Sequence, residues 1–236
     1  MNREEKIAQE YLSRLSLGQV IHEPDGNVPP DFKVGPRLAV EVRRLNQQRF
    51  TSHYAEGLEK VGVPIIRTLK KVLSSYDAAF QGTSYLMGVQ YGRPSDESTA
   101  QPSKLMKGVI DKFLKGDRKV PCTLKVSSKI WLSISASPVI PNRMFYLAGN
   151  SDLDSGGWLI PMYVQNITYC IQEKKIKVAP YRQKYPTWWL FLVDTIGWGL
   201  DSEDEREVRS GITDLGGFNK ILIVDSLGKN TLMTIT

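Results

Sequence analysis

The sequence predicts an α/β (α+β) fold in which helices flank a central sheet. Residues 3–16 and 163–178 read as helices, the first with apolar residues repeating at 3.6-residue spacing. Residues 38–44, 188–194 and 220–225 are short apolar runs of the kind that form buried strands. At 236 residues the chain has the length of one large domain, so we expect a single domain over 1–236.

The first helix, over 3–16, places Ile7, Tyr11 and Leu12 on one apolar face. Glu4 falls on that same face. An acid in a first helical turn also interacts favourably with the helix dipole, which would explain Glu4 without any site. A short strand over 19–22 and a loop with Asp-Gly and Pro-Pro punctuation follow the helix.

A hairpin is expected next. Gly35 and Pro36 form a turn signal that folds residues 31–34 back against 38–44. Side chains alternate between the two faces of a strand, so Leu38, Val40 and Val42 point one way and Ala39, Glu41, Arg43 and Leu45 the other. Asp31 and Glu41 then lie near each other at one edge of the sheet.

Two carboxylates and a nearby backbone carbonyl form a cluster of hard oxygen ligands, which suits Mg²⁺ or Mn²⁺. The alternative is simpler. Asp31 could be a turn or cap residue, and Glu41 with Arg43 an ion pair on a half-exposed strand, worth about 0–1 kcal/mol. Both interpretations stay open at the level of the sequence.

The stretch PPDFKVGPRLAVEVRRLNQ resembles the PD-(D/E)xK nuclease superfamily, which has the restriction-endonuclease-like fold. Pro30-Asp31 and Glu41-Val42 match its motif, while Arg43 stands where the family has lysine. The resemblance implies a central mixed sheet flanked by helices. It also implies that Asp31 and Glu41 are metal ligands, with the Val42 carbonyl as a third and Glu4 as a supporting acid.

The middle of the chain raises a question of organisation. If the helix 163–178 and the strand 188–194 complete the core, about 50–160 is a large insertion; otherwise 56–76 is the core helix. Within that segment the expected elements are helices at 56–76 and 103–116, a polar loop at 93–102, strands at 85–91 and 129–136, and short strands at 144–148 and 158–162.

The charge distribution favours an acidic partner. The net charge is +6, and cations cluster in 60–71, 104–119 and 173–184. Such stripes can neutralise the phosphates of nucleic acid, although each also fits the solvated face of a helix. The two cysteines suggest neither a disulfide framework nor a zinc site. No secretory signal or membrane-spanning run is visible, so a cytoplasmic location is expected.

The resemblance, together with the basic charge, implies a metal-dependent nuclease-like protein that hydrolyses DNA phosphodiester bonds with Mg²⁺ or Mn²⁺. Arg43 could offset charge on the transition state but cannot act as a base. Lys174 or Lys177 is the candidate for an amine that gives up a proton. The alternative is a non-catalytic DNA-binding or assembly protein with a degenerate site. The sequence leaves open whether the chain forms a homodimer.

Overall fold

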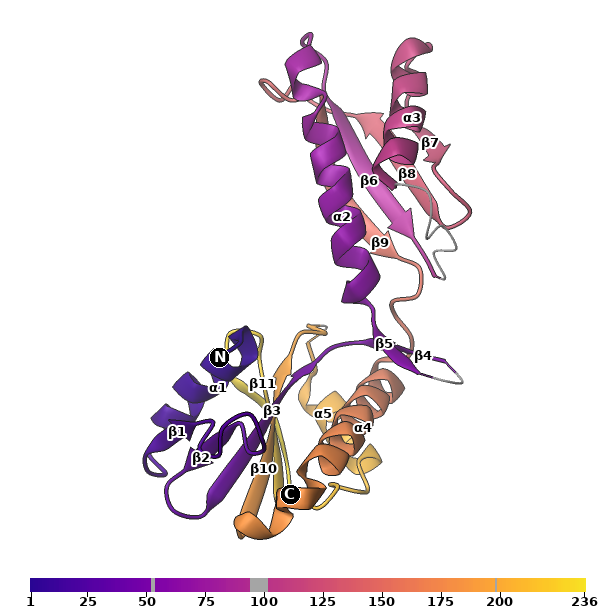
Figure 1. The fold of residues 1–236 in the computed structure, drawn as a ribbon. Coiled ribbons are helices and arrows are strands. Elements are labelled where there is room, and N and C mark those ends of the chain that lie inside the picture. The colour runs from indigo at the N-terminus through magenta and orange to yellow at the C-terminus, as the bar shows by residue number, and fades with distance from the viewer. Residues whose placement is uncertain (52–53, 94–101, 198) are drawn as a thin grey trace. The chain divides into compact units, whose positions relative to one another are not determined.

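The computed structural model describes residues 1–51, 54–93, 102–197 and 199–236 (Figure 1). The chain forms two compact units. The first unit combines Met1–Gln48 with Gly157–Thr236, and the second is Arg49–Gly156. The second unit therefore interrupts the sequence of the first. It covers nearly the same residues as the segment 50–160, which is an insertion if the helix 163–178 and the strand 188–194 complete the core.

A six-stranded mixed sheet forms the centre of the first unit, in the order β1-β2-β3-β10-β11-β12. The three central strands, β3, β10 and β11, run parallel, and the outer pairs are antiparallel. The strands are β1 (Val20–His22), β2 (Phe32–Val34), β3 (Leu38–Leu45), β10 (Thr187–Asp194), β11 (Lys220–Val224) and β12 (Thr231–Ile235).

Helices cover both faces of this sheet (Figure 1). Helix α1 (Arg3–Arg14) packs Ala8 and Leu12 against one face, together with Val40 and Val42 of β3. Helices α4 (Leu159–Val178) and α5 (Ser202–Gly211) cover the other face, where Ala39 joins their core. A 3-10 helix, η2 (Ala179–Lys184), follows α4. The first unit is therefore an α/β layer structure.

Strand β3 lies inside the sheet between β2 and β10, and its two faces enter different cores. The hairpin is confirmed, because Phe32 pairs with Val40 and Val34 with Leu38 in an antiparallel register. The alternation of side chains along β3 is also confirmed by the separate cores that contain Val40 and Ala39. Glu41 therefore points to the face that α4 covers.

The second unit has a four-stranded sheet in the order β7-β8-β6-β9. Helices α2 (Glu59–Ser74) and α3 (Pro102–Lys115) cover one face of it, with Leu69, Met106 and Leu132 among its fully buried core residues. The strands are β6 (Tyr85–Tyr91), β7 (Cys122–Lys125), β8 (Ile130–Ala136) and β9 (Phe145–Asp152). A 3-10 helix, η1 (Asp77–Ala79), follows α2, and β4 (Gln48–Phe50) pairs with β5 (Ala55–Gly57).

The prediction of a strand over 158–162 is wrong. Residues 158–162 begin helix α4 instead, which starts at Leu159. Pro161 fits there because the first helical turn leaves its backbone N–H groups without intrahelical partners. Of the loop expected over 93–102, residues 94–101 lie outside the described residues. Within the described part of the chain, no helix combines the length and apolar character needed to cross a bilayer.

Candidate active site

Asp31 is held at the end of the hairpin by a backbone hydrogen bond. The pairing of β2 with β3 ends at Phe32 and Val40. The next amide of β3 that points toward β2 is that of Val42, and it has no strand partner there. This N–H donates to Oδ2 of Asp31 at 2.7 Å. The N–H and C=O of one strand residue point to the same edge, so the Val42 carbonyl also faces the Asp31 side.

Glu41 is fully buried in the middle of β3, with 0% of its side chain exposed. Its neighbours on the same face, Ala39 and Leu45, belong to the apolar core beneath α4. A lone carboxylate in such a place would cost several kcal/mol or more. Its burial therefore requires compensation, which comes from α4.

Lys174 supplies that compensation. It lies on the inward face of α4 with Ile167, Ile171 and Val178, and its side chain is only 8% exposed. Its Nζ lies 2.6 Å from Oε2 of Glu41 and 3.4 Å from Oδ2 of Asp31. The two carboxylates are thus close enough to share one cation, as the hairpin and the parity of β3 predict.

Lys177, one helical turn further on, reaches the same pair from the solvent side. Its Nζ lies 3.3 Å from Oε2 of Glu41 and 3.6 Å from Oδ1 of Asp31, and its side chain is 47% exposed. Burial lowers the pKa of Lys177, but the charges of Glu41 and Asp31 outweigh it and raise this pKa above its ordinary value. With no metal on these carboxylates, Lys177 is therefore a cation at neutral pH.

Arg43 pairs with a residue other than Glu41. Its Nη2 donates to Oε2 of Glu173 on α4 at 2.8 Å. In the described residues Glu41 forms its ion pairs with Lys174 and Lys177. The surface pair of Glu41 and Arg43, the simpler interpretation of the sequence, is not the arrangement observed. Arg43 remains on the α4 side of the sheet, beside the cluster.

Glu4 is placed differently from the other candidates. It belongs to the first turn of α1, which packs on the face of the sheet that carries Val40 and Val42. Glu41 points to the opposite face. Across the described residues, no hydrogen bond or ion pair joins Glu4 to Asp31 or Glu41. The neighbouring Glu5 closes the cap of α1 with Asn2.

The donor atoms fit a hard divalent cation. Oε1 of Glu41 is buried and has no hydrogen-bond partner among the described residues, which leaves it available as a ligand. Asp31 contacts the same Lys174 ammonium as Glu41 does, and the Val42 carbonyl faces the Asp31 side of β3. The described residues contain no group of three or more His, Cys, Asp and Glu side chains that could hold a metal. Mg²⁺ is commonly bound by one or two carboxylates with water and phosphate oxygens, so the pair is sufficient.

A second buried acid was not predicted. Asp194, at the end of β10, accepts hydrogen bonds from the Tyr163 hydroxyl at 2.9 Å and the Ile196 N–H at 2.8 Å. Its burial raises the pKa of this carboxyl above the ordinary value. The signal in the sequence is an acid that directly follows the apolar run of β10.

The chain was compared with family models, with curated proteins and with solved structures, and none of the three comparisons found a match.

Proposed function

We propose that this protein is a metal-dependent nuclease that hydrolyses phosphodiester bonds of DNA. The observation that supports this most is the convergence of Asp31, Glu41 and Lys174, with Glu41 fully buried. Replacing a buried ion cluster by apolar residues is often neutral or stabilising, so such a cluster is weak evidence for a stabilising role. Two carboxylates and an ammonium are the groups needed to hold a metal ion and to face a phosphate.

Asp31, Glu41 and the Val42 carbonyl would hold Mg²⁺ or Mn²⁺. When bound, the ion would supply a water of lowered pKa and polarise the scissile phosphate. The Val42 N–H, 2.7 Å from Oδ2 of Asp31, fixes the Asp31 carboxylate for this role. The apolar residues packed around Glu41 beneath α4 hold its side chain in place.

The cation of the motif comes from α4 in this proposal. The resemblance places a lysine at position 43, and the chain has Arg43 there, tied to Glu173. Lys174 approaches Glu41 more closely than any other described cation, at 2.6 Å. Its ammonium, and that of Lys177, would offset the negative charge that develops on the phosphate.

Cleavage of supercoiled plasmid with Mg²⁺ or Mn²⁺ tests this function. Wild type should cut, and Asp31→Asn and Glu41→Gln should each abolish cutting, because both changes are isosteric and remove a ligand charge. Glu173→Gln is the matched control, since Glu173 is an acid of the same region that contacts only Arg43 among the described ion pairs. Cutting that survives in both site variants would place the catalysis elsewhere.

A specific observation favours the alternative of a non-catalytic DNA-binding protein. Two lysines face two carboxylates, so the cluster is neutral without a metal. An inactive wild type that still binds DNA in EDTA would favour this second function.

A further inference from the structure

The net positive charge of the chain lies in the second unit. Unit 1, comprising 1–48 and 157–236, has equal numbers of basic and acidic residues, 16 of each. Unit 2, comprising 49–156, has 15 basic and 9 acidic residues, so it carries the whole charge of +6. The candidate active site and the basic charge therefore belong to different units.

Within the second unit the excess is confined to two helices. Helix α2 carries Glu59 as its one acid and α3 carries Asp111 as its one acid. The cations are Lys60, Arg67, Lys70 and Lys71 on α2 and Lys104, Lys107, Lys112 and Lys115 on α3. All eight are exposed, because the opposite faces of both helices enter the core. The remainder of the unit is neutral.

These cations form one surface with little internal compensation. Helices α2 and α3 pack against each other, and the hydroxyl of Tyr76, which follows α2, donates to Asp111 on α3 at 2.6 Å. Asp111 also pairs with Lys107 at 3.5 Å. Within the described residues, Lys70, Lys71, Lys112 and Lys115 form no ion pair. We call the exposed faces of α2 and α3 the basic helical surface.

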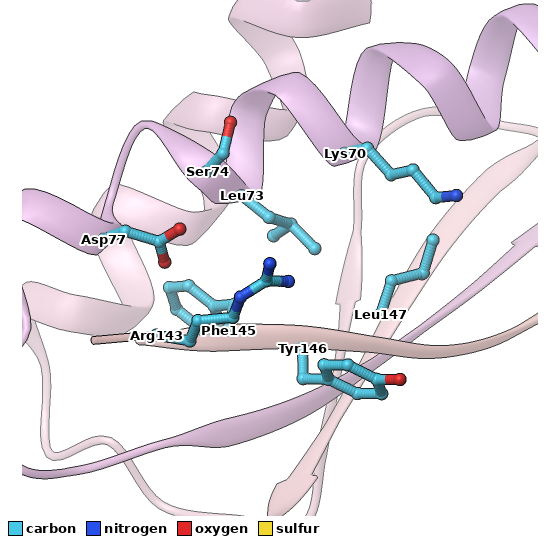
Figure 2. A pocket seen from close by; sticks show the side chains of 8 residues that line it. All are labelled: Lys70, Leu73, Ser74, Asp77, Arg143, Phe145, Tyr146 and Leu147. Atoms are coloured by element: carbon cyan, nitrogen blue, oxygen red, sulfur yellow. The ribbon is translucent and has the colours of Figure 1, made fainter. Parts of the chain in front are cut away.

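A pocket adjoins this surface at α2. It has a volume of about 370 Å³ and is lined by Lys70 and Ser74 of α2, by Arg143 just before β9 and by Tyr146 of β9. Figure 2 shows the side chains of Lys70 and Arg143 on opposite walls of this pocket, with Asp77 at one end. Oδ1 of Asp77 accepts a hydrogen bond from the Met144 N–H at 3.3 Å, so one of its carboxylate oxygens is already bound by the backbone.

We infer that the basic helical surface binds the backbone of duplex DNA, and that the pocket between Lys70 and Arg143 takes one of its phosphates. This inference rests on the proposed function and adds to it the surface that would bind the DNA substrate. Phosphates bind Lys and Arg largely through charge, without reading sequence. Single strands are held by exposed aromatic rings on which bases stack. Helix α2 has no aromatic residue and the Phe113 ring of α3 is buried. At the pocket the Phe145 ring is buried and the Tyr146 ring is 45% exposed, so the described residues there offer one ring rather than a series on which bases could stack, and the surface suits a duplex.

Binding of a fluorescent DNA duplex by the full chain in EDTA, at a series of salt concentrations, tests this inference. The variant Lys70→Gln/Lys71→Gln/Lys112→Gln/Lys115→Gln removes four charges from the surface. It should weaken binding at least about tenfold and lower the salt slope by about 3–4, since each lost phosphate contact accounts for about 1. Arg143→Gln alone should lower the slope by about 1.

The matched control removes four exposed charges from the first unit, as Lys6→Gln/Arg37→Gln/Lys184→Gln/Lys229→Gln. It should bind like wild type, which excludes an effect of net charge alone. Equal losses in both quadruple variants, or tighter binding of a single strand of the same length, would overturn the inference. Because EDTA removes the metal, failure to bind DNA contradicts the surface alone. Binding without cleavage in Mg²⁺ contradicts the nuclease proposal alone.

Discussion

Lys174→Met tests the role of the buried ammonium. The change keeps the length and apolar stem of the side chain but removes the charge that lies 2.6 Å from Glu41 and 3.4 Å from Asp31. Removing one partner of a buried ion pair costs about 3–5 kcal/mol. Lys177 remains 3.3 Å from Glu41, and a half-exposed pair of this kind returns about 1 kcal/mol. We expect the free energy of unfolding to fall by about 2–4 kcal/mol without metal.

The assay is urea denaturation followed by tryptophan fluorescence. Four of the five tryptophans belong to the first unit, among them the buried Trp188 on β10, next to β3, so the signal comes mainly from this unit. Lys175→Met is the matched control: Lys175 is the next residue of α4, is 47% exposed and pairs with Asp214 on the surface. This control should leave the denaturation midpoint unchanged.

Mg²⁺ extends this test to the metal site. A divalent ion should replace the lost ammonium, so Mg²⁺ should stabilise Lys174→Met more than wild type. A concentration of a hundred times the dissociation constant adds about 2.7 kcal/mol. An unchanged midpoint in Lys174→Met, or equal effects of Mg²⁺ on both proteins, would refute the role given to Lys174.

Three further predictions concern other groups. Arg43→Ala should slow cleavage less than the loss of about 10²–10³ expected for Lys174→Met in single-turnover assays, because Arg43 is tied to Glu173; a larger loss for Arg43→Ala would make Arg43 the main cation. Burial raises the pKa of the Cys170 thiol to about 12 in the folded protein. At a pH just above the ordinary pKa of a thiol, Cys170 therefore ionises in the unfolded chain but not in the folded one. The free energy of unfolding should therefore be unaffected by this group below pH 9 and fall between about pH 9 and 12. Cys170→Ala should flatten that part of the stability profile, and an unaltered slope would contradict the assignment. Arg93→Ala should destabilise the second unit by about 3–5 kcal/mol, because Arg93 forms a buried bidentate pair with Asp152; unchanged hydrogen exchange in β6 would disprove it.

The hairpin and its polar face could be predicted because their signals are local. A turn at Gly35-Pro36 and a period of two place Glu41 on one face of β3, and the register of β2 with β3 agrees. The identity of the layer covering that face is not a local property. It depends on α4, which begins more than a hundred residues later in the sequence.

The partners of the site charges illustrate this limit. Lys174 carries a signal in the sequence, since it lies at helical spacing from Ile167, Ile171 and Val178 on the buried face of α4. That Lys174 pairs with the buried Glu41, rather than with an acid at the surface, depends on the packing of α4 across β3. The pairing of Arg43 with Glu173 depends on the same packing and could not be anticipated from Arg43 alone.

Elements with weak patterns were missed or misassigned. Strand β7 (Cys122–Lys125) has only four residues, and half of them face solvent. The apolar residues at the start of α4, Leu159, Ile160 and Met162, fit a strand as well as a helix, and in the fold they pack as part of the helix against the core of the first unit. Short apolar runs are ambiguous between helix and strand until their tertiary neighbours are known.

Calorimetric titration with Mn²⁺ tests the central claim most directly, because it measures whether Asp31 and Glu41 hold a divalent ion. We predict that wild type binds one Mn²⁺ per chain and that Glu41→Gln, which removes the buried carboxylate, abolishes this binding. The folded state of the variant should be checked in the same sample by tryptophan fluorescence. A folded Glu41→Gln protein that binds Mn²⁺ as wild type does, or a wild type that binds none, would contradict the account.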